Sequence, residues 1–189
     1  MKLSILIPTL PERRFQLNRL IGILNDQIHL SNADCEILID DRPKNNPSVG
    51  QKRNELIKRA TGEYFCFIDD DDFITQDYIS LITKAISFNP DVITFKGWMT
   101  TNGGAHVDWI IKLGEKYEAR KDTDGITRYY RFPNHLCAFK NELVKDFTFH
   151  AISQGEDYQW ALKINNTGVL KTEIHIDKQI YHYDFKTNK

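Results

Sequence analysis

Four consecutive aspartates, Asp69–Asp72, are the residues whose type and spacing most directly indicate chemistry. Adjacent carboxylates repel one another, so all four are ionised at low cost only where water or a cation offsets their charge. In an extended segment, Asp69 and Asp71 project to one side, and Asp70 and Asp72 project to the other. Proteins usually hold Mg²⁺ or Mn²⁺ with one or two carboxylates and the phosphates of a substrate. The run therefore predicts a divalent-cation site; the alternative is a solvated acidic loop.

Each of three predicted strands is followed directly by a polar segment, and the four aspartates are one of these segments. Mainly apolar runs at Leu3–Ile7, Cys35–Ile39 and Tyr64–Ile68 are typical of strands that are buried on both faces of a parallel sheet. The first two are followed by Pro8-Thr9 and Asp40-Asp41, and the third is followed by the aspartates. Ligands of parallel α/β sheets bind beyond the carboxyl ends of the strands. These polar groups are therefore expected to meet at one edge of a sheet.

Helices are expected between the strands. Apolar residues recur at helical spacing at Leu17, Leu20, Ile21 and Leu24, and again at Ile79, Ile82 and Ile86. After a loop at Lys44–Pro47, Ser48 and Gln51 predict a capping box for a helix that reaches about residue 60, with Gly62 as its C-terminal stop. Val92–Phe95 is a fourth predicted strand. The order predicts an α/β fold with a mostly parallel central sheet flanked by helices.

After the fourth strand the pattern changes. Residues 98–132 are polar, aromatic and predicted to be rich in loops, with Gly103-Gly104 as a turn or flexible flap. A helix is predicted from Glu156 to about residue 165. Two short strands, Thr172–Ile176 and Ile180–Tyr183, are predicted to follow. This part of the chain is interpreted as a small mixed region beside the main sheet, within a single domain.

Composition limits the class of protein. The chain has 189 residues, 41% hydrophobic residues and a formal net charge of −1, which is typical of one globular domain without a polyanionic partner. The N-terminal apolar stretch is too short for a secretion signal, and no run approaches the length of a membrane span. The cysteines show no metal-ligand spacing, so buried thiols in a cytoplasmic protein are expected. They are Cys35, Cys66 and Cys137.

Several segments, in order along the chain, resemble family 2 glycosyltransferases with the GT-A fold. The segments are Ser4–Thr9, Asp40-Asp41, Lys52–Asn54, Ala60–Asp72 and Gly155–Trp160. Each piece alone is degenerate, but the ordered set is specific and spans nearly the whole chain. The short form also looks like compact members of the family from phages and some bacteria.

The resemblance implies a metal-dependent, inverting transfer of a sugar from a nucleoside diphosphate sugar to an acceptor hydroxyl. It implies Asp71 as a ligand of Mn²⁺ or Mg²⁺, which acts as a Lewis acid on the leaving diphosphate. Asp157 matches the position of the general base, and the first turn of a helix keeps such a carboxylate ionised. The alternative for Glu156 and Asp157 is an ordinary acidic helix N-terminus.

The resemblance also implies a nucleotide-sugar site within residues 1–97 and an acceptor-binding, catalytic half within residues 98–189. The predicted nucleotide-sugar-binding residues are Pro8, Thr9, Arg13, Asp40, Asp41, Arg53, Asp69 and Asp70. For Arg53 the alternative is a charge on a helix surface. His182 is a second predicted metal ligand, with a packed side chain as the alternative. His135 and Glu156 are predicted on the acceptor side.

The identities of the substrates stay open at this level. A uridine diphosphate sugar is the expected donor, although Arg42-Pro43 replaces the Gly-Ser that often follows the second strand in the family. The acceptor is a glycan, a small molecule or a hydroxylated base of phage DNA, for which Arg120-Lys121 and Arg128–Phe132 offer cations and aromatic rings. The structural alternative for Arg128–Phe132 is a strand whose Tyr and Phe side chains pack inward and whose Arg side chains face outward. Alternatives of another class are a nucleotidyltransferase and a catalytically silent nucleotide-sugar-binding module. A nucleotidyltransferase usually carries a Gly-rich loop where this chain has Thr9–Arg13.

Overall fold

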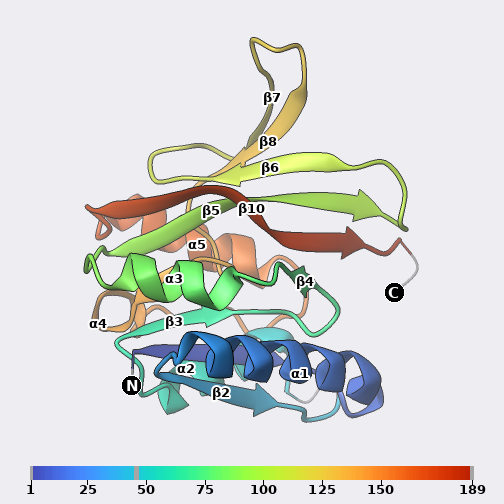
Figure 1. Ribbon diagram of the computed structural model, residues 1–189, viewed down its shortest axis with the longest axis vertical. Helices are drawn as coiled ribbons and strands as arrows, with labels where there is room; N and C mark the ends of the chain where they lie inside the picture. The colour runs from blue at the N-terminus through green and yellow to red at the C-terminus, as the bar shows by residue number, and fades with distance from the viewer. Residues whose placement is uncertain (1, 45–46, 188–189) are drawn as a thin grey trace.

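A computed structural model describes residues 2–44 and 47–187, and its strands form one ten-stranded sheet (Figure 1). The strands are β1 (Leu3–Pro8), β2 (Cys35–Asp40), β3 (Tyr64–Phe67), β4 (Phe73–Ile74), β5 (Val92–Thr101), β6 (Val107–Ile111), β7 (Glu118–Lys121), β8 (Thr127–Arg131), β9 (Ala138–Lys140) and β10 (Glu173–Phe185). The helices are α1 (Arg14–Ser31), α2 (Val49–Arg59), α3 (Tyr78–Ile86), α4 (Asn141–Val144) and α5 (Glu156–Thr167), with a 3₁₀ turn at Pro11–Arg13. Part of the predicted loop at 44–47 lies outside the described residues.

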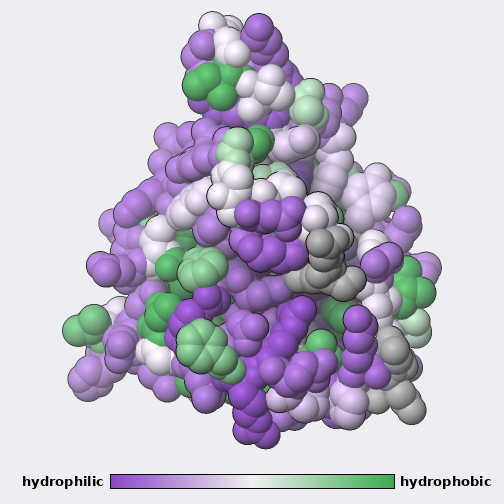
Figure 2. All heavy atoms as spheres, turned by 90° about the vertical axis from the view of Figure 1, so that its right-hand side faces the viewer, coloured by the Kyte–Doolittle hydropathy of each residue, from purple (hydrophilic) through white to green (hydrophobic). Residues whose placement is uncertain are grey.

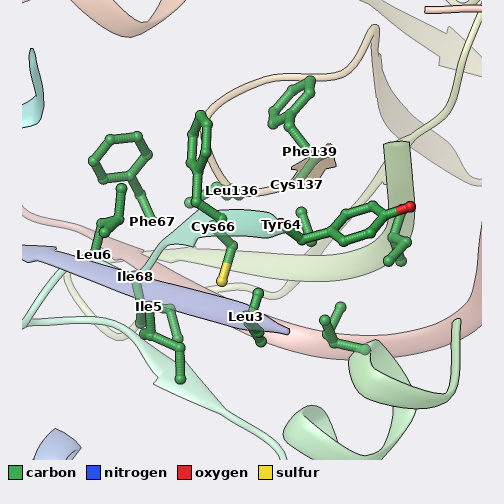
Figure 3. Packing of buried hydrophobic residues seen from close by; sticks show 14 of the residues in the cluster. Leu3, Ile5, Leu6, Tyr64, Cys66, Phe67, Ile68, Leu136, Cys137 and Phe139 are labelled. Atoms are coloured by element: carbon green, nitrogen blue, oxygen red, sulfur yellow. The ribbon is translucent and has the colours of Figure 1, made fainter. Parts of the chain in front are cut away.

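The first three strands confirm the predicted parallel arrangement. Strand β1 lies between β2 and β3 and is parallel to both, and its last residue, Pro8, is in register with Asp40. Every residue of β1 and β3 is buried, as predicted. The prediction that the second strand is buried on both faces is wrong, because β2 lies at the edge of the sheet and only its last residue, Asp40, is buried. Figure 3 shows Leu6, Phe67 and Phe139 among the side chains packed in this part of the core. The three carboxyl ends therefore meet at one edge.

The fourth strand is placed differently from the prediction. The short antiparallel strand β9 pairs with β3 on one side and with β5 on the other, so β5 runs parallel to β3 without contacting it. Strand β9 has three residues, and such a run shows no readable alternation in the sequence. A polypeptide segment from the second half of the chain is thus inserted into the sheet of the first half.

The prediction that residues 98–132 are rich in loops is wrong. Strand β5 continues to Thr101, β6 and β9 pair antiparallel to it, and β8 and β7 extend the sheet beyond β6. The predicted turn at Gly103 is confirmed, with φ of 52° at Asn102 and 71° at Gly103. The β7–β8 hairpin projects from the body of the molecule at the top of Figure 1.

The two predicted C-terminal strands are one strand. Strand β10 pairs in parallel with β5 over its whole length, with register shifts between Ile176 and Tyr181 that interrupt the apolar pattern. The division proposed at residues 97 and 98 falls inside β5, so both halves share one sheet. The functional division itself stays a prediction.

Helices cover both faces of the sheet. Helix α1 packs against α3 on one face, and α2 packs against α5 on the other (Figure 1). The predicted capping box is present, because Gln51 N–H donates to Ser48 Oγ and Ser48 N–H donates to Gln51 Oε1. Among the described residues, none of the helices combines the length and apolar character that a membrane crossing requires.

Gly62 does not stop helix α2 in the predicted way. The helix ends at Arg59, and Gly62 is not among the glycines with positive φ. A Cβ atom at Gly62 would lie 2.7 Å from both the backbone nitrogen and the hydroxyl of Ser4. The glycine therefore permits the chain to pass close to β1 before it enters β3. The thiol of Cys66 is buried as predicted, and that of Cys137 is buried too, whereas Cys35, which was also expected to be buried, is half-buried.

Candidate active site

The four aspartates form a tight turn directly after β3, and we call Asp69–Asp72 the acidic turn. The Asp72 N–H donates to the Asp69 carbonyl at 3.1 Å. Asp70 and Asp72 are only 1% and 2% exposed. The side chains of Asp69 and Asp71 keep 29% and 26% of their surface exposed. The predicted alternation is confirmed, and it divides the turn into two inward carboxylates and two outward ones.

The inward carboxylates hold the turn in place. Asp70 accepts hydrogen bonds from Thr9 Oγ1 at 2.5 Å and from an Arg13 Nη atom at 2.8 Å. Asp72 accepts one from the Tyr181 hydroxyl at 2.6 Å. Burial raises the pKa of Asp70, although the hydrogen bonds from Thr9 and Arg13 oppose this effect. Of the predicted pocket residues, Thr9 and Arg13 thus meet Asp70 at the strand ends.

Three supporting residues escaped the sequence-based predictions. Arg19 on α1 donates to the carbonyls of Asp70 and Asp72 at 3.3 and 2.7 Å, and these partners are 51 and 53 positions away. Tyr181 on β10 is 109 positions from Asp72. Lys52 on α2 is buried, and its ammonium group donates to backbone carbonyls. No local pattern predicts the contacts of Arg19 and Tyr181, because each acts on a segment far away in the chain. Lys52 lies in a segment that carries the family resemblance, but the sequence assigned it no role.

The outward carboxylates face two arginines. An Arg13 Nη atom lies 3.2 Å from Asp71 Oδ2, so Arg13 bridges Asp70 and Asp71. An Arg53 Nη atom lies 3.1 Å from Asp69 Oδ1. The side chain of Arg53 is only 4% exposed, which excludes the alternative of a charge on the helix surface. Two buried or half-buried guanidinium groups therefore balance part of the negative charge of the turn.

The ends of β1 and β2 are tied together beside this turn. Asp40 is buried and makes a bidentate pair with Arg42, with Nε···Oδ1 at 2.9 Å and Nη2···Oδ2 at 2.5 Å. Burial alone would raise the pKa of Asp40, but the hydrogen bonds from Arg42 outweigh it and lower the pKa. The Lys52 ammonium joins the two loops by donating to the carbonyls of Thr9 and Arg42. Asp41 is exposed at this edge.

The second acidic segment comes from the first turn of α5, across from the acidic turn. Gly155 precedes the helix with φ of 74°, and Glu156 and Asp157 are its first residues. His135 lies between the two acidic segments, with Nδ1 3.5 Å from Asp157 Oδ2 and Nε2 3.8 Å from Asp69 Oδ2. The structure thus brings Asp157 and the acidic turn to one place through His135.

The two acidic residues of α5 have opposite environments. Burial would raise the pKa of Asp157, but the positive charges of His135 and Arg53 outweigh it and lower the pKa. Burial raises the pKa of Glu156, against the opposing charge of Arg53, whose Nη1 lies 3.9 Å away. Asp157 is therefore the carboxylate that stays ionised as the pH falls.

His182 does not join the acidic turn. Its ring stacks on Trp98 and Phe73, with centroid distances of 5.0 and 5.5 Å, and its Nε2 lies 3.0 Å from Thr100 Oγ1. Its neighbour Tyr181 bonds to the turn, and adjacent residues of a strand point to opposite faces. In the part of the chain that the structure describes, no group of three or more His, Cys, Asp or Glu side chains is arranged to hold a metal. A metal role for His182 stays a prediction without structural support.

Two of the four cations predicted to favour a DNA acceptor, Arg120 and Arg128, are paired with carboxylates. Arg120 lies 3.3 Å from both Glu115 and Glu118. Arg128 lies 2.7 Å from Asp122 and from Asp124. The segment Arg128–Phe132 is mainly strand β8, with Tyr130 and Phe132 buried, as the structural alternative predicts. Figure 2 faces the edge at which β2 and β3 end, and hydrophilic side chains cover most of that view.

Comparison with known structures identifies the fold class of this architecture. The chain superposes on S. aureus TarS 1–349 in complex with UDP with a TM-score of 0.66 and 18% identity, over 97% of this chain and 60% of that one. TarS 1–349 in complex with UDP-GlcNAc gives a TM-score of 0.61 and 17% identity, over 100% of this chain and 60% of that one. The chain thus spans about 60% of the length of these structures. The fold is that of the GT-A glycosyltransferases, as the sequence predicted.

The family follows from the sequence. Residues 19–154 match the profile of Glycosyl transferase family 2, which is more than half of the chain. The chain belongs to this family. No curated protein matches the chain significantly.

Proposed function

We propose that the chain is a metal-dependent, inverting glycosyltransferase that uses a nucleoside diphosphate sugar, with uridine diphosphate as the carrier. The carrier is proposed because structures with the same fold contain UDP and UDP-GlcNAc. One observation carries the proposal: the Asp157 carboxylate lies across from the acidic turn, and the His135 ring spans the two with contacts of 3.5 and 3.8 Å. A single displacement needs a leaving-group site and a proton acceptor on opposite sides of the reacting carbon.

In this proposal, different residues bind the nucleotide, bind the diphosphate and accept the proton of the acceptor. Pro8, Thr9, Asp40 and Asp41 line the nucleotide side, and Arg13 and Arg53 attract the diphosphate away from their present carboxylate partners. Asp157 accepts the proton of the acceptor hydroxyl while the hydroxyl oxygen bonds to the anomeric carbon. The bond from that carbon to the phosphate oxygen breaks, and the nucleoside diphosphate leaves with the electron pair.

The acidic turn fits a divalent cation through one outward carboxylate. Asp71 keeps a quarter of its side chain exposed at the carboxyl edge of the sheet. One protein carboxylate with phosphate oxygens and water is a usual set of ligands for Mg²⁺ or Mn²⁺. A cation held there by Asp71 would offset the negative charge that develops on the leaving diphosphate. Asp70 and Asp72 are excluded from this role in the proposal, because they are buried and hydrogen-bonded.

The other candidate functions have less support. A nucleotidyltransferase disagrees with the family match, and a silent binding module gives no reason for Asp157 to face the acidic turn. The acceptor is proposed to be a glycan or a small molecule. A DNA acceptor needs cations that face the solvent, and Arg120 and Arg128 are paired with carboxylates.

A thermal-shift screen tests the proposed function. UDP-, GDP-, CMP- and dTDP-sugars are added with and without Mn²⁺, and a ligand that binds the folded state raises the melting temperature. We expect metal-dependent stabilisation by UDP-GlcNAc or another UDP-sugar, and slow release of UDP with water as the acceptor. If no nucleotide sugar stabilises the protein in either condition, the proposed function is wrong.

A further inference from the structure

Backbone hydrogen bonds fix the segment around His135 beside the acidic turn. The His135 carbonyl accepts a hydrogen bond from the Phe67 N–H at 3.2 Å, which ties it to the last residue of β3. The side-chain oxygen of the preceding Asn134 accepts a hydrogen bond from the Leu136 N–H at 3.1 Å. The backbone carbonyl of Asn134 accepts one from the Cys137 N–H at 2.9 Å. Because β3 leads directly into the acidic turn, this turn-like segment fixes the His135 ring beside Asp69.

The ring itself is buried and incompletely bonded. The side chain of His135 is 9% exposed, and its Nδ1 is a buried nitrogen without a hydrogen-bond partner. Asp157 Oδ2 lies 3.5 Å from this nitrogen, slightly beyond hydrogen-bond distance. A buried donor without a partner costs about 1–3 kcal/mol, and hydrogen bonds in active sites are often long until the substrate binds.

We propose that His135 is a positioning residue for the general base: Nδ1–H holds the Asp157 carboxylate toward the acceptor, while the ring remains anchored beside Asp69. This inference rests on the proposed function of Asp157. A small movement of α5 toward β3 when the substrates bind would shorten the 3.5 Å contact to a hydrogen bond. The ring would then hold the base at a set distance from the leaving-group side of the site.

The amides of asparagine and glutamine separate this role from simple packing. The Asn amide nitrogen can replace Nδ1, and the Gln amide nitrogen can replace Nε2. His135→Asn therefore keeps a donor for Asp157, and His135→Gln keeps only a donor on the side of Asp69. If His135 only filled space, the larger Gln would be the better replacement.

The first measurement needs no substrate. Carbon NMR follows the titration of the Asp157 carboxyl in the wild-type protein and in both variants. Both variants lose the positive charge of His135, so the pKa of Asp157 rises in each, but it rises less in His135→Asn because a donor remains. Equal values in the two variants, or a smaller rise in His135→Gln, would overturn the inference.

The second measurement is the release of UDP from UDP-GlcNAc with Mn²⁺. We expect His135→Gln to lower kcat between about 10- and 100-fold with little change in the KM of the donor, and His135→Asn to retain most of kcat. In an Asp157→Asn background, His135→Gln is expected to have no further effect, because it acts through Asp157. Independent, multiplying losses would also overturn the inference.

Controls separate this inference from the function on which it rests. His175→Gln changes a half-buried histidine whose Nδ1 contacts Thr94 at 2.9 Å outside the site, and it should leave kcat unchanged. Thermal unfolding shows whether each variant folds. If the wild-type protein binds and cleaves no nucleotide sugar, the proposed function fails, while the NMR titration still decides the contact between His135 and Asp157.

Discussion

Two clusters of aspartates and arginines occur in this molecule, and they differ in how completely they are bonded. The first is the acidic turn, Asp69–Asp72, with Arg13 and Arg53. The second, which we call the distal cluster, consists of Asp108, Asp122, Asp124 and Arg128 on and beside β6 and β8. Their charges are of the same kind, but only the acidic turn is a run of consecutive aspartates directly after a buried strand, within a segment that resembles the family.

In the distal cluster the charges satisfy one another. The Arg128 guanidinium lies within 3.5 Å of three carboxylates, and Asp122 also accepts the Tyr130 hydroxyl at 2.7 Å. Hydrogen bonds from Tyr130 and Arg128 lower the pKa of Asp122. These side chains are 19–47% exposed, and their charges form a fully paired ion-pair network.

Around the acidic turn the bonding is incomplete. Arg53 and His135 supply three of the six buried side-chain nitrogen and oxygen atoms that lack a hydrogen-bond partner among the described residues. These atoms lie between the acidic turn and α5, where the carboxyl ends of parallel strands meet. Incomplete bonding of buried donors at a strand edge therefore distinguishes a candidate active site from a structural ion-pair network.

The largest expected effect is a loss of catalytic rate that occurs when the proposed base is replaced and not when the distal cluster is changed. Asp157→Asn should reduce UDP release from UDP-GlcNAc by about 10²–10⁴-fold, because the base is lost, and donor binding should remain. The matched change Asp124→Asn in the distal cluster should leave the rate within about twofold of wild type. Initial rates at saturating donor measure both. A full rate in Asp157→Asn would remove the assignment of the base.

The second effect concerns the metal. Asp71→Ala should abolish the Mn²⁺-dependent rise in melting temperature that a UDP-sugar produces, because the proposed protein ligand is missing. Asp124→Ala removes an equally charged side chain from the distal cluster and should retain the rise. Differential scanning fluorimetry with and without Mn²⁺ measures both. Identical shifts in wild type and Asp71→Ala would exclude Asp71 as the metal ligand.

The third effect compares two tyrosine hydroxyls that each donate to an aspartate. Tyr181→Phe should cost about 1–3 kcal/mol of unfolding free energy, because it leaves buried Asp72 without that donor. Tyr130→Phe removes a donor of Asp122, whose side chain is 19% exposed so that water can replace the hydroxyl, and it should cost less. Urea unfolding measures both variants. An equal or larger loss of unfolding free energy in Tyr130→Phe would show that the two clusters do not differ in how strongly they depend on a single hydrogen bond.

The smallest effect is a difference in the sign of the pH dependence. The folded-state pKa of Glu156 is raised by burial, so its contribution to stability is present below its ordinary pKa of about 4.5 and is lost as the pH rises through the folded value. The pKa of Asp122 is lowered by its hydrogen bonds, so its contribution is present above about 3.8 and is lost as the pH falls.

The two variants should therefore diverge between pH 3 and pH 7. Relative to wild type, Glu156→Gln should become more stable as the pH rises, and Asp122→Asn should become less stable. Urea unfolding at about one-unit steps of pH tests both signs. Parallel trends in the two variants would mean that burial does not separate the environments of these carboxyl groups.

Local pattern predicted much of the fold and of the site. Apolar runs identified the strands β1, β2 and β3, and helical spacing identified α1, α3 and α5. The two-residue period of an extended chain predicted how the aspartates of the acidic turn pair up on two sides, and the structure showed which pair is buried. Ser48 and Gln51 predicted their capping box, because its groups are only three residues apart.

The predictions failed where a non-local pairing decided the outcome. Strand β9 enters the sheet between β3 and β5 although it is far from both of them in the chain. Its three residues are too short to show a period, and their extended conformation depends on two neighbouring strands. The loop-rich interpretation of residues 98–132 failed for a related reason, because polar side chains on an exposed hairpin mask the strand pattern.

The order of apolar runs and charged residues along the chain was sufficient to predict where acidic groups follow buried strands. The donors that these carboxylates receive depend instead on the folded arrangement: Tyr181 and Arg19 reach the acidic turn from 109 and 53 positions away, and His135 is set beside Asp69 by its bond to β3. Hydrogen bonding depends on the final distance between two groups, and the folded chain sets that distance independently of their separation in sequence.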